Sequence, residues 1–294
     1  MIRIRLGTRG SPLALVQAGQ VRDALAAAHG CAVDIVPVRT TGDKVQDRAL
    51  AEIGGKALWT KELDRALLAG EIDCAVHSMK DVETVRPPEI AIAAMLERAD
   101  VRDRLVGAAS FEALPEAARI GTSSPRRAAQ VRRIRGDLRP VLFRGNVDTR
   151  LAKLAAGEAE ATLLAAAGLA RLGRDDIGVP IPLETMLPAP AQGAVGIEAR
   201  AGDGAMLEML AAIGHRDTEK CVHAERAVLA ALHADCHSPV AVLARIGADG
   251  VAIDAELLAE DGSESVRLSG QDPDALAAAL LAAAPAAIAR LFGA

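Results

Sequence analysis

Arginines in residues 119–150 concentrate positive charge in a way that predicts a binding site for an anion. The segment holds nine arginines, no lysine and two acidic residues, so it carries +7, whereas the whole chain carries −5 and the remainder therefore −12. A guanidinium group is planar, keeps its charge when buried, and binds a carboxylate or phosphate through two hydrogen bonds. This chemistry suits a localised anion.

The positions of these arginines separate them into two sets. One set follows strand-like runs, where α/β proteins place their ligand sites, and consists of Arg126, Arg127, Arg144 and Arg150. We interpret the other set as the solvated basic face of a helix; it consists of Arg132, Arg133, Arg135 and Arg139.

Lysine is scarce, with six residues against 28 arginines, yet three lysines fall within one window of 25 residues. We expect Lys61 to lie on a helix surface. Lys56 follows two glycines and Lys80 follows a strand-like run, so both are better candidates for a site.

Of the four cysteines, Cys236 is the candidate nucleophile. It lies in a short polar loop after a predicted helix, and a thiolate in such a loop can attack an electron-poor carbon. Cys31 and Cys74 lie in apolar strand-like runs and are expected to be packed thiols, whereas Cys221 is unassigned.

A metal site is the alternative interpretation of the same loop. His233, Cys236 and His237, together with His223, could supply ligands. These residues lack the paired spacing of structural zinc sites, and no metal is therefore expected.

Composition limits the partners. One Trp, three Phe and no Tyr leave almost no aromatic surface for stacking on bases, and the negative net charge argues against a nucleic-acid partner.

The sequence also gives expectations about the compartment. Residues 1–6 alternate like a strand and show no secretion signal, and the alanine-rich stretches carry too many charges to span a membrane. No cysteines form a C-x-x-C pair. We expect a cytoplasmic, reduced protein whose ligand is a small molecule with several carboxylates.

Strand-like and helix-like segments alternate along the first third of the chain. Ser11 is the predicted N-cap of a helix with Pro12 at its first position and Gly30 after its end. This alternation is typical of a mostly parallel sheet covered by helices on both faces. The expected strands are 2–6, 32–38 and 72–77, and the expected helices are 12–29 and 61–69.

A weak internal repeat predicts a second lobe. Arg5-Leu-Gly-Thr, followed by Ser11-Pro12, is matched by Arg119-Ile-Gly-Thr, followed by Ser124-Pro125. Each copy indicates a strand, a turn and a helix N-terminus, where exposed amides can bind an anion. Two such seats suggest a ligand cleft between two lobes. The second lobe continues with strand 141–143, helix 148–156 and strand 161–165, and strand 193–199 could return to the first sheet.

The last third of the chain has a different pattern. A helix is expected at 218–232, followed by three strand-like runs up to Ser269 and a final helix at 273–291, capped by Asp272 and kinked at Pro285. Helices on a small antiparallel sheet make a separate α+β domain. The expected domains are 1–98 with 193–213, then 99–192, then 214–294.

Six sequence motifs along the chain, taken together, resemble the porphobilinogen deaminase (hydroxymethylbilane synthase) family over nearly its whole length. The most distinctive is His77-Ser-Met-Lys-Asp-Val82. The others are Gly7-Thr-Arg-Gly-Ser-Pro-Leu-Ala-Leu15, Gly54-Gly-Lys-Ala-Leu-Trp-Thr-Lys-Glu-Leu63, Gly121-Thr-Ser-Ser-Pro-Arg-Arg127, Arg144-Gly-Asn-Val-Asp-Thr-Arg150 and Gln192-Gly-Ala-Val-Gly-Ile-Glu198. Cys236 in the last domain completes the resemblance.

The resemblance implies a fold and an activity. The fold would be α/β, with two periplasmic-binding-protein-like lobes of mixed, mostly parallel sheets and a C-terminal α+β domain that carries the cofactor. The activity would join four porphobilinogen molecules head to tail, releasing ammonia, into the linear tetrapyrrole hydroxymethylbilane. The chain of pyrroles would grow on a dipyrromethane cofactor attached to Cys236 by a thioether. We further expect a monomer.

The resemblance also assigns roles to residues. Asp81 matches the catalytic aspartate, whose carboxylate would stabilise positive charge on the pyrrole N–H groups and relay a proton. Residues expected to hold cofactor carboxylates, besides the attachment at Cys236, are Lys80, Thr122, Ser124, Arg126 and Arg127. Residues expected to hold the incoming substrate are Arg9, Ser11, Lys56, Arg144, Arg150 and Arg171. Asn146 and Gln192 are assigned either to the ligand or to structure.

Four departures from the family pattern remove no reacting group. Ala234-Asp235 precedes Cys236 where glycines are common, Trp59 stands where Phe is frequent, Glu52 stands where Lys is frequent, and Glu83 replaces a common Pro. Two rival functions use the same residues: a two-lobed anion-binding protein without catalysis, and an enzyme with a Schiff base on Lys80. Neither rival explains Cys236.

Overall fold

The computed structural model describes residues 2–38 and 60–292. Their contacts divide them into two units. The first unit contains residues 2–38, 60–99 and Gly193–Lys220, and the second contains residues 100–192 and 221–292. None of the helices in these described segments has the length and apolar character needed to cross a membrane.

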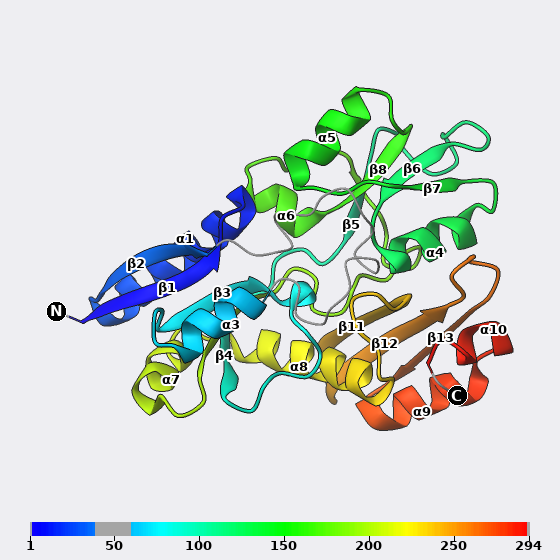
Figure 1. Cartoon of the computed structure of the whole chain (residues 1–294). Helices are drawn as coiled ribbons and strands as arrows, with labels where there is room; N and C mark the ends of the chain where they lie inside the picture. The colour runs from blue at the N-terminus through cyan, green and yellow to red at the C-terminus, as the bar shows by residue number, and fades with distance from the viewer. Residues whose placement is uncertain (1, 39–59, 293–294) are drawn as a thin grey trace. The chain divides into compact units, whose positions relative to one another are not determined.

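The first unit is built on a five-stranded sheet in the order β2-β1-β3-β10-β4, and Figure 1 labels β1, β2, β3 and β4 of this sheet. Neighbours β2, β1 and β3 are parallel, and β10 is antiparallel to the strands on either side of it. The strands are β1 (Arg3–Arg9), β2 (Ala32–Val38), β3 (Cys74–Ser78), β4 (Ile90–Met95) and β10 (Val195–Arg200). Strand β10 confirms the prediction that the segment after residue 193 returns to the first sheet.

Helices cover both faces of this sheet. Successive side chains of a strand point to opposite faces, so each face presents apolar side chains against which a helix can pack. Cys74 and Val76 pack with α1 (Pro12–His29) and α7 (Gly204–Ala211), whereas Ala75 packs with α3 (Lys61–Leu68) on the opposite face. The bounds of α1 match the prediction: the Ser11 side chain accepts a hydrogen bond from the Ala14 amide, and Gly30 ends the helix in the left-handed conformation at φ 61°.

The second unit contains a five-stranded sheet with the same pattern, in the order β7-β6-β8-β5-β9 (Figure 1). Neighbours β7, β6 and β8 are parallel, and β5 is antiparallel to β8 and β9. The strands are β5 (Asp103–Val106), β6 (Arg119–Thr122), β7 (Arg139–Leu142), β8 (Ala161–Ala165) and β9 (Val179–Pro180), and the helices are α4 (Pro125–Ile134), α5 (Val147–Ala155) and α6 (Ala166–Arg171).

The sequence repeat occupies equivalent places in these two sheets. Strands β1 and β6 each lie between two parallel neighbours, and each ends in or just after the repeated Gly-Thr pair. Both glycines are required by close packing: a Cβ on Gly7 would lie 2.3 Å from the Ile72 side chain, and one on Gly121 would lie 2.3 Å from the Phe143 ring.

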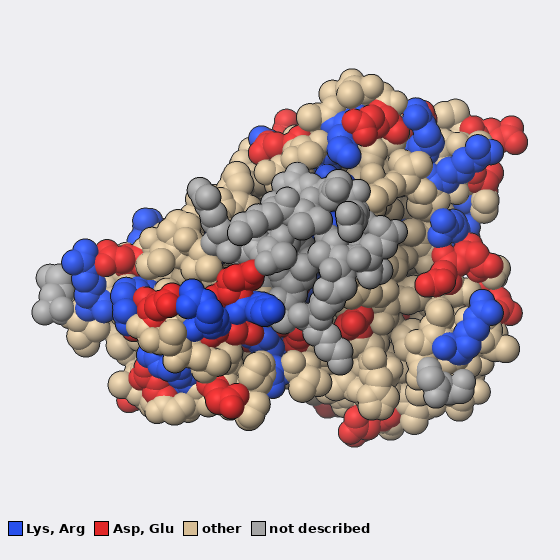
Figure 2. Space-filling model, in the orientation of Figure 1, with Lys and Arg blue, Asp and Glu red and all other residues tan. Residues whose placement is uncertain are grey.

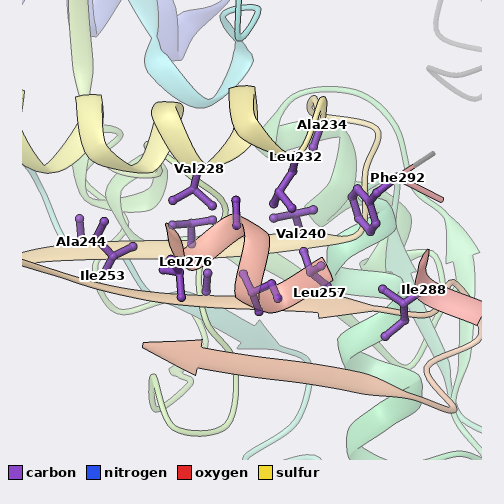
Figure 3. Packing of buried hydrophobic residues seen from close by; sticks show 14 of the residues in the cluster. Val228, Leu232, Ala234, Val240, Ala244, Ile253, Leu257, Leu276, Ile288 and Phe292 are labelled. Carbon is purple, nitrogen blue, oxygen red and sulfur yellow. The ribbon is translucent and has the colours of Figure 1, made fainter. Parts of the chain in front are cut away.

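The same unit also contains an antiparallel three-stranded sheet, β11 (Val240–Gly247), β12 (Gly250–Leu258) and β13 (Ser265–Gly270). Apolar side chains from β11, β12, α8 (Arg216–Ala231) and α9 (Pro273–Ala283) point toward one another and form its core (Figure 3). The chain is therefore α/β, with two mixed, mostly parallel sheets and a C-terminal α+β part.

The final helix differs from the prediction of one kinked helix over 273–291. Helix α9 begins as expected, since the Ala275 amide donates to the Asp272 carboxylate at 2.8 Å. It ends at Ala283 because Ala284 precedes a proline and adopts extended backbone at φ −70° and ψ 128°. A separate short helix, α10 (Ala286–Ala289), follows Pro285.

Candidate active site

The carboxyl ends of β1 and β3 bring three predicted site residues together in the first unit. Because these strands are parallel neighbours, their carboxyl ends meet at one edge of the sheet. Arg9 ends β1, Ser11 caps α1, and Asp81 ends the one-turn 3₁₀ helix that follows β3. All three line a pocket whose other residues are Leu13, Ala14, Gln17, Val76, His77 and Ser78.

Backbone contacts hold the turn that carries Asp81. The Met79 amide donates to the Ala194 carbonyl at 3.1 Å, and the Val82 amide donates to the Met79 carbonyl at 3.2 Å. The Met79 side chain is 1% exposed and lies against Gly196, where a Cβ would be 2.0 Å from its sulfur. Lys80 and Asp81 therefore extend from a turn whose first residue is fixed on β10.

A network of charged side chains lies behind the pocket. His77 Nε2 lies 3.1 Å from the Glu198 carboxylate, and this carboxylate accepts hydrogen bonds from Arg86 at 2.7 and 2.9 Å. Burial opposes ionisation of Glu198, but His77 and Arg86 outweigh it and lower its pKa to about 2. Glu198 is thus an anion at neutral pH. The network did not follow from the sequence, because its members lie far apart along the chain.

In the second unit, the carboxyl ends of β6, β7 and β8 carry the remaining arginines. Arg126 and Arg127 lie in the first turn of α4, whose N-cap Ser124 accepts a hydrogen bond from the Arg127 amide at 3.4 Å. The Ser124 amide in turn donates to the Thr122 hydroxyl at 3.1 Å. These residues form a helix N-terminus of the kind that binds anions.

Asp103 pairs with both arginines inside the second unit. Its two carboxylate oxygens accept from Arg126 Nη2 at 2.9 Å and Arg127 Nη2 at 2.6 Å. Gln192 also donates to Asp103 at 2.8 Å, which gives that glutamine a structural role. Burial opposes ionisation of Asp103, yet the two guanidinium groups hold its pKa well below its usual range. Asp103 was not predicted as a site residue, because β5 is short and contains two charged residues.

The cluster around Asp103 retains a surplus of positive charge. Two guanidinium groups share one carboxylate, and the nearby pair of Arg133 and Glu256 adds no net charge, so the surplus is +1. The Nε atoms of Arg126 and Arg127 are buried and have no hydrogen-bond partner among the described residues. Buried donors are costly to leave unpaired, so this geometry suits a bound anion.

Arg144 and Arg150 lie on the loop and helix after β7. Arg144 is 6% exposed, and Arg150 donates to the Gly145 carbonyl at 3.1 Å and to the Ser123 hydroxyl at 3.2 Å. Asn146 is the N-cap of α5 and accepts from the Thr149 amide at 2.9 Å, which is a structural role. Arg171, at the end of α6 after β8, is half-buried, and burial lowers its pKa.

The prediction of a solvated basic face was wrong for three of the four arginines assigned to it, because their guanidinium groups bind backbone carbonyls of other segments. Arg132 donates to the Glu260 carbonyl at 2.7 Å, Arg133 donates to the Thr185 carbonyl at 2.6 Å, and Arg135 donates to the Phe111 carbonyl at 2.7 Å. These contacts join α4 to surrounding segments of the second unit. Only Arg139 of that set is exposed. The face drawn in Figure 2 shows acidic and basic side chains intermixed.

Cys236 is exposed, whereas Cys31, Cys74 and Cys221 are buried, and none of the four forms a disulfide. Burial raises the pKa of Cys74 to about 12, so that thiol stays protonated. The turn that contains Cys236 is held by Asp235, whose carboxylate accepts from the His237 amide at 2.8 Å. The departure at Asp235 therefore stabilises the loop. No group of three or more His, Cys, Asp or Glu within the described part of the chain could hold a metal ion.

Lys56 lies outside the described residues, as do Glu52 and Trp59.

Comparison with known proteins identifies the family. The "Porphobilinogen deaminase, dipyromethane cofactor binding domain" family matches residues 4–208, and the "Porphobilinogen deaminase, C-terminal domain" family matches residues 219–282. The chain belongs to the porphobilinogen deaminase family. The porphobilinogen deaminase of Sphingopyxis alaskensis is 59% identical over 98% of this chain and 96% of its own length. That of Paracoccus denitrificans is 51% identical over 94% of this chain and 90% of its own length.

Among solved structures, a TRAP periplasmic solute binding protein from Desulfovibrio salexigens aligns with a TM-score of 0.44 and 10% identity over 74% of each chain. This likeness is too low to carry an argument about function.

Proposed function

We propose that this chain condenses four porphobilinogen molecules head to tail, with loss of ammonia, into hydroxymethylbilane. The proposal rests on one observation above all: the family string at residues 77–82 places Asp81 in a pocket with Arg9 and Ser11. The two family matches, which together span residues 4–208 and 219–282, support it.

The residues of the second unit fit the carboxylates of a dipyrromethane cofactor. The surplus charge around Asp103 and the unpartnered Nε atoms of Arg126 and Arg127 are suited to an anion that is not a protein side chain. When bound, the dipyrromethane supplies the anchor on which the pyrrole chain grows. Arg126 and Arg127, with Thr122, Ser124 and Lys80, would hold its carboxylates, and the exposed Cys236 would carry it through a thioether.

Asp81 is the catalytic carboxylate of the proposal. Loss of ammonia from porphobilinogen requires a proton on the amine and leaves an azafulvene whose pyrrole N–H carries positive charge. A carboxylate beside that N–H stabilises the charge and can relay the proton. Asp81 is half-buried at the edge of a pocket, so it can meet substrate while part of its hydration is removed.

The remaining cations bind the acetate and propionate of the incoming pyrrole. In the first unit the cation is Arg9. The Ser11 hydroxyl and the N-terminus of α1 lie at the same pocket and can also bind a carboxylate. In the second unit they are Arg144, Arg150 and Arg171, which follow the parallel strands β7 and β8. Lys56 completes the proposed set.

We also propose a cytoplasmic monomer with three domains, 1–98 with 193–213, then 99–192, then 214–294. Sedimentation of the purified protein tests the monomer, and limited proteolysis at the proposed boundaries tests the domains.

Turnover tests the proposed function. The purified protein should release ammonia from porphobilinogen and form one tetrapyrrole for every four ammonia molecules. Asp81→Asn should lower kcat by at least about 10²-fold, because an amide cannot carry the charge. Asp34→Asn, a surface change in the same unit, is the control. Binding of porphobilinogen without ammonia release would instead favour a non-catalytic anion-binding protein.

A further inference from the structure

Arg86 lies at the centre of three carboxylates in the first unit. Its guanidinium donates to Glu198 from Nε and Nη2, to Glu83 from Nη1 at 2.6 Å and to Asp64 from Nη2 at 2.5 Å. The Arg86 side chain is 7% exposed, and that of Glu198 is fully buried. Every nitrogen of the guanidinium therefore has an anionic partner. The pair of bonds from Nε and Nη2 to Glu198 is bidentate, a geometry that arginine can adopt and lysine cannot.

These contacts reach both ends of the short segment that carries Asp81. Glu83 lies two residues after Asp81, and its carboxylate accepts from Arg86 and from the Thr60 hydroxyl at 2.8 Å. His77 lies four residues before Asp81, and it shares the Glu198 carboxylate with Arg86. One guanidinium thus links residues 77 and 83 through two different carboxylates.

Within this segment, the turn that begins at Met79 is held on β10. Met79 is fixed by its backbone bond to Ala194 and by its buried side chain. The Val82 amide then donates back to the Met79 carbonyl. Asp81 therefore lies between a turn held on β10 and Glu83, whose carboxylate is held by Arg86 and Thr60.

Charge makes Arg86 the component on which the arrangement depends. Glu198, Glu83 and Asp64 carry three negative charges around one guanidinium. Without that cation the three carboxylates would repel one another, and Glu83, which is 22% exposed, would lose its ion pair with Arg86. The ion pair between Arg86 and Glu83 is thus one of the contacts that hold the end of the segment after Asp81.

We propose that Arg86 is a positioning residue that holds Asp81 in the pocket by fixing both ends of segment 77–83. Arg86 does not line the pocket, so it acts through Glu83 and through the Glu198–His77 pair. The proposal rests on the catalytic role assigned to Asp81 above. It also gives the departure at Glu83 a function: where a proline would hold the chain by its own stiffness, an ion pair holds it here.

The test compares Arg86→Met with Arg200→Met. Arg200 belongs to the same unit and also links separate elements, since it donates to the Leu67 and Ile72 carbonyls at 2.9 Å and to Asp203 at 2.7 Å. None of these partners belongs to segment 77–83. Two readouts are needed: kcat and KM with porphobilinogen, and hydrogen exchange of the amides of residues 79–83.

Arg86→Met should lower kcat at least tenfold with a smaller change in KM, and should speed exchange in residues 79–83. Arg200→Met should lower thermal stability without either effect. Because Arg86→Met can impair folding, Glu83→Gln provides a milder variant that leaves the Arg86–Glu198 contact in place. It should show the same pattern at a smaller size.

Exchange separates the positioning claim from the proposed activity. If exchange in residues 79–83 rises no more in Arg86→Met and Glu83→Gln than in Arg200→Met, the positioning role is wrong, whatever the turnover. If exchange rises as expected but kcat falls no further than in Arg200→Met, the segment is held by Arg86 and the claim that this hold serves catalysis is overturned. Failure of the unmodified protein to release ammonia would contradict the proposed function alone, since exchange still tests the hold on the segment.

Discussion

Arg126 and Arg127 share a single carboxylate, and this sharing leaves positive charge inside the second unit. Asp103 fixes both guanidinium groups, while their buried Nε atoms have no hydrogen-bond partner among the described residues. The arginines could be recognised from the sequence, because they follow a strand and open a helix. Asp103 could not, since its partners are more than 20 residues away along the chain.

The first prediction separates arginines that hold the cofactor from those that hold substrate. Arg126→Leu or Arg127→Leu leaves buried anions without a partner, a cost of about 3–5 kcal/mol, and should prevent assembly of the cofactor. Arg144→Leu and Arg150→Leu should keep the cofactor on Cys236 but stall with one to three extra pyrroles. Mass spectrometry after addition of porphobilinogen resolves these species.

An identical set of covalent species in Arg127→Leu and Arg144→Leu would contradict this division of roles. Arg139→Leu, which changes an exposed arginine of the same segment, is the control and should behave like the unmodified protein.

The second prediction concerns acid stability and Glu198. Its pKa is about 2 in the folded protein and about 4.5 when unperturbed, so its stabilising effect is complete above pH 4.5 and is lost as pH falls toward 2. At pH 7 this contribution is about 3 kcal/mol. Glu198→Gln should therefore be less stable than the unmodified protein at pH 7, and the difference should shrink as pH falls from 4.5 to 2.

Thermal unfolding measured across this pH range checks the second prediction. Asp103 titrates in both proteins, so its effect cancels in the difference. If the stability difference between the unmodified protein and Glu198→Gln stays constant from pH 7 to pH 2, ionisation of Glu198 does not stabilise the folded protein.

At the scale of elements, the sequence predicts the helices and strands whose capping residues and apolar pattern agree with the way they pack. Helix α1 has a cap, a proline and a terminal glycine, and its bounds were predicted correctly. Strand β5 was missed because its four residues include Asp103 and Arg104, which hide the apolar pattern. Strand β4 was also missed, since an alanine-rich run does not distinguish strand from helix.

The third prediction uses two glycines to test how tightly these elements pack. A Cβ at Gly121 would lie 2.3 Å from the Phe143 ring, so Gly121→Ala should destabilise the protein by about 1–3 kcal/mol through overpacking. Gly19 lies within α1 with nothing within 4 Å of its Cβ position, so Gly19→Ala should stabilise by about 0.5–1 kcal/mol. Urea unfolding of both variants provides the measurement, and equal effects of the same sign would contradict the packing account.

At the scale of the whole molecule, two sheets repeat one strand order. In each sheet the first three strands in the order are parallel, and the fourth strand, β10 or β5, is antiparallel to both of its neighbours. In each case this antiparallel strand comes shortly after the chain passes from one unit to the other. The weak Gly-Thr repeat was the trace of this duplication in the sequence. The antiparallel position of β5 could not be predicted, because pairing across distant segments depends on the completed sheet.

The intact mass of the protein, purified from cells that make porphobilinogen, tests the central claim most directly. The account predicts a mass above that of the chain by one dipyrromethane, and the unmodified chain mass for Cys236→Ala. Cys221→Ala, which changes a buried thiol, should keep the added mass. An unmodified mass for the natural sequence would contradict the proposed function, and an added mass retained in Cys236→Ala would contradict the attachment site.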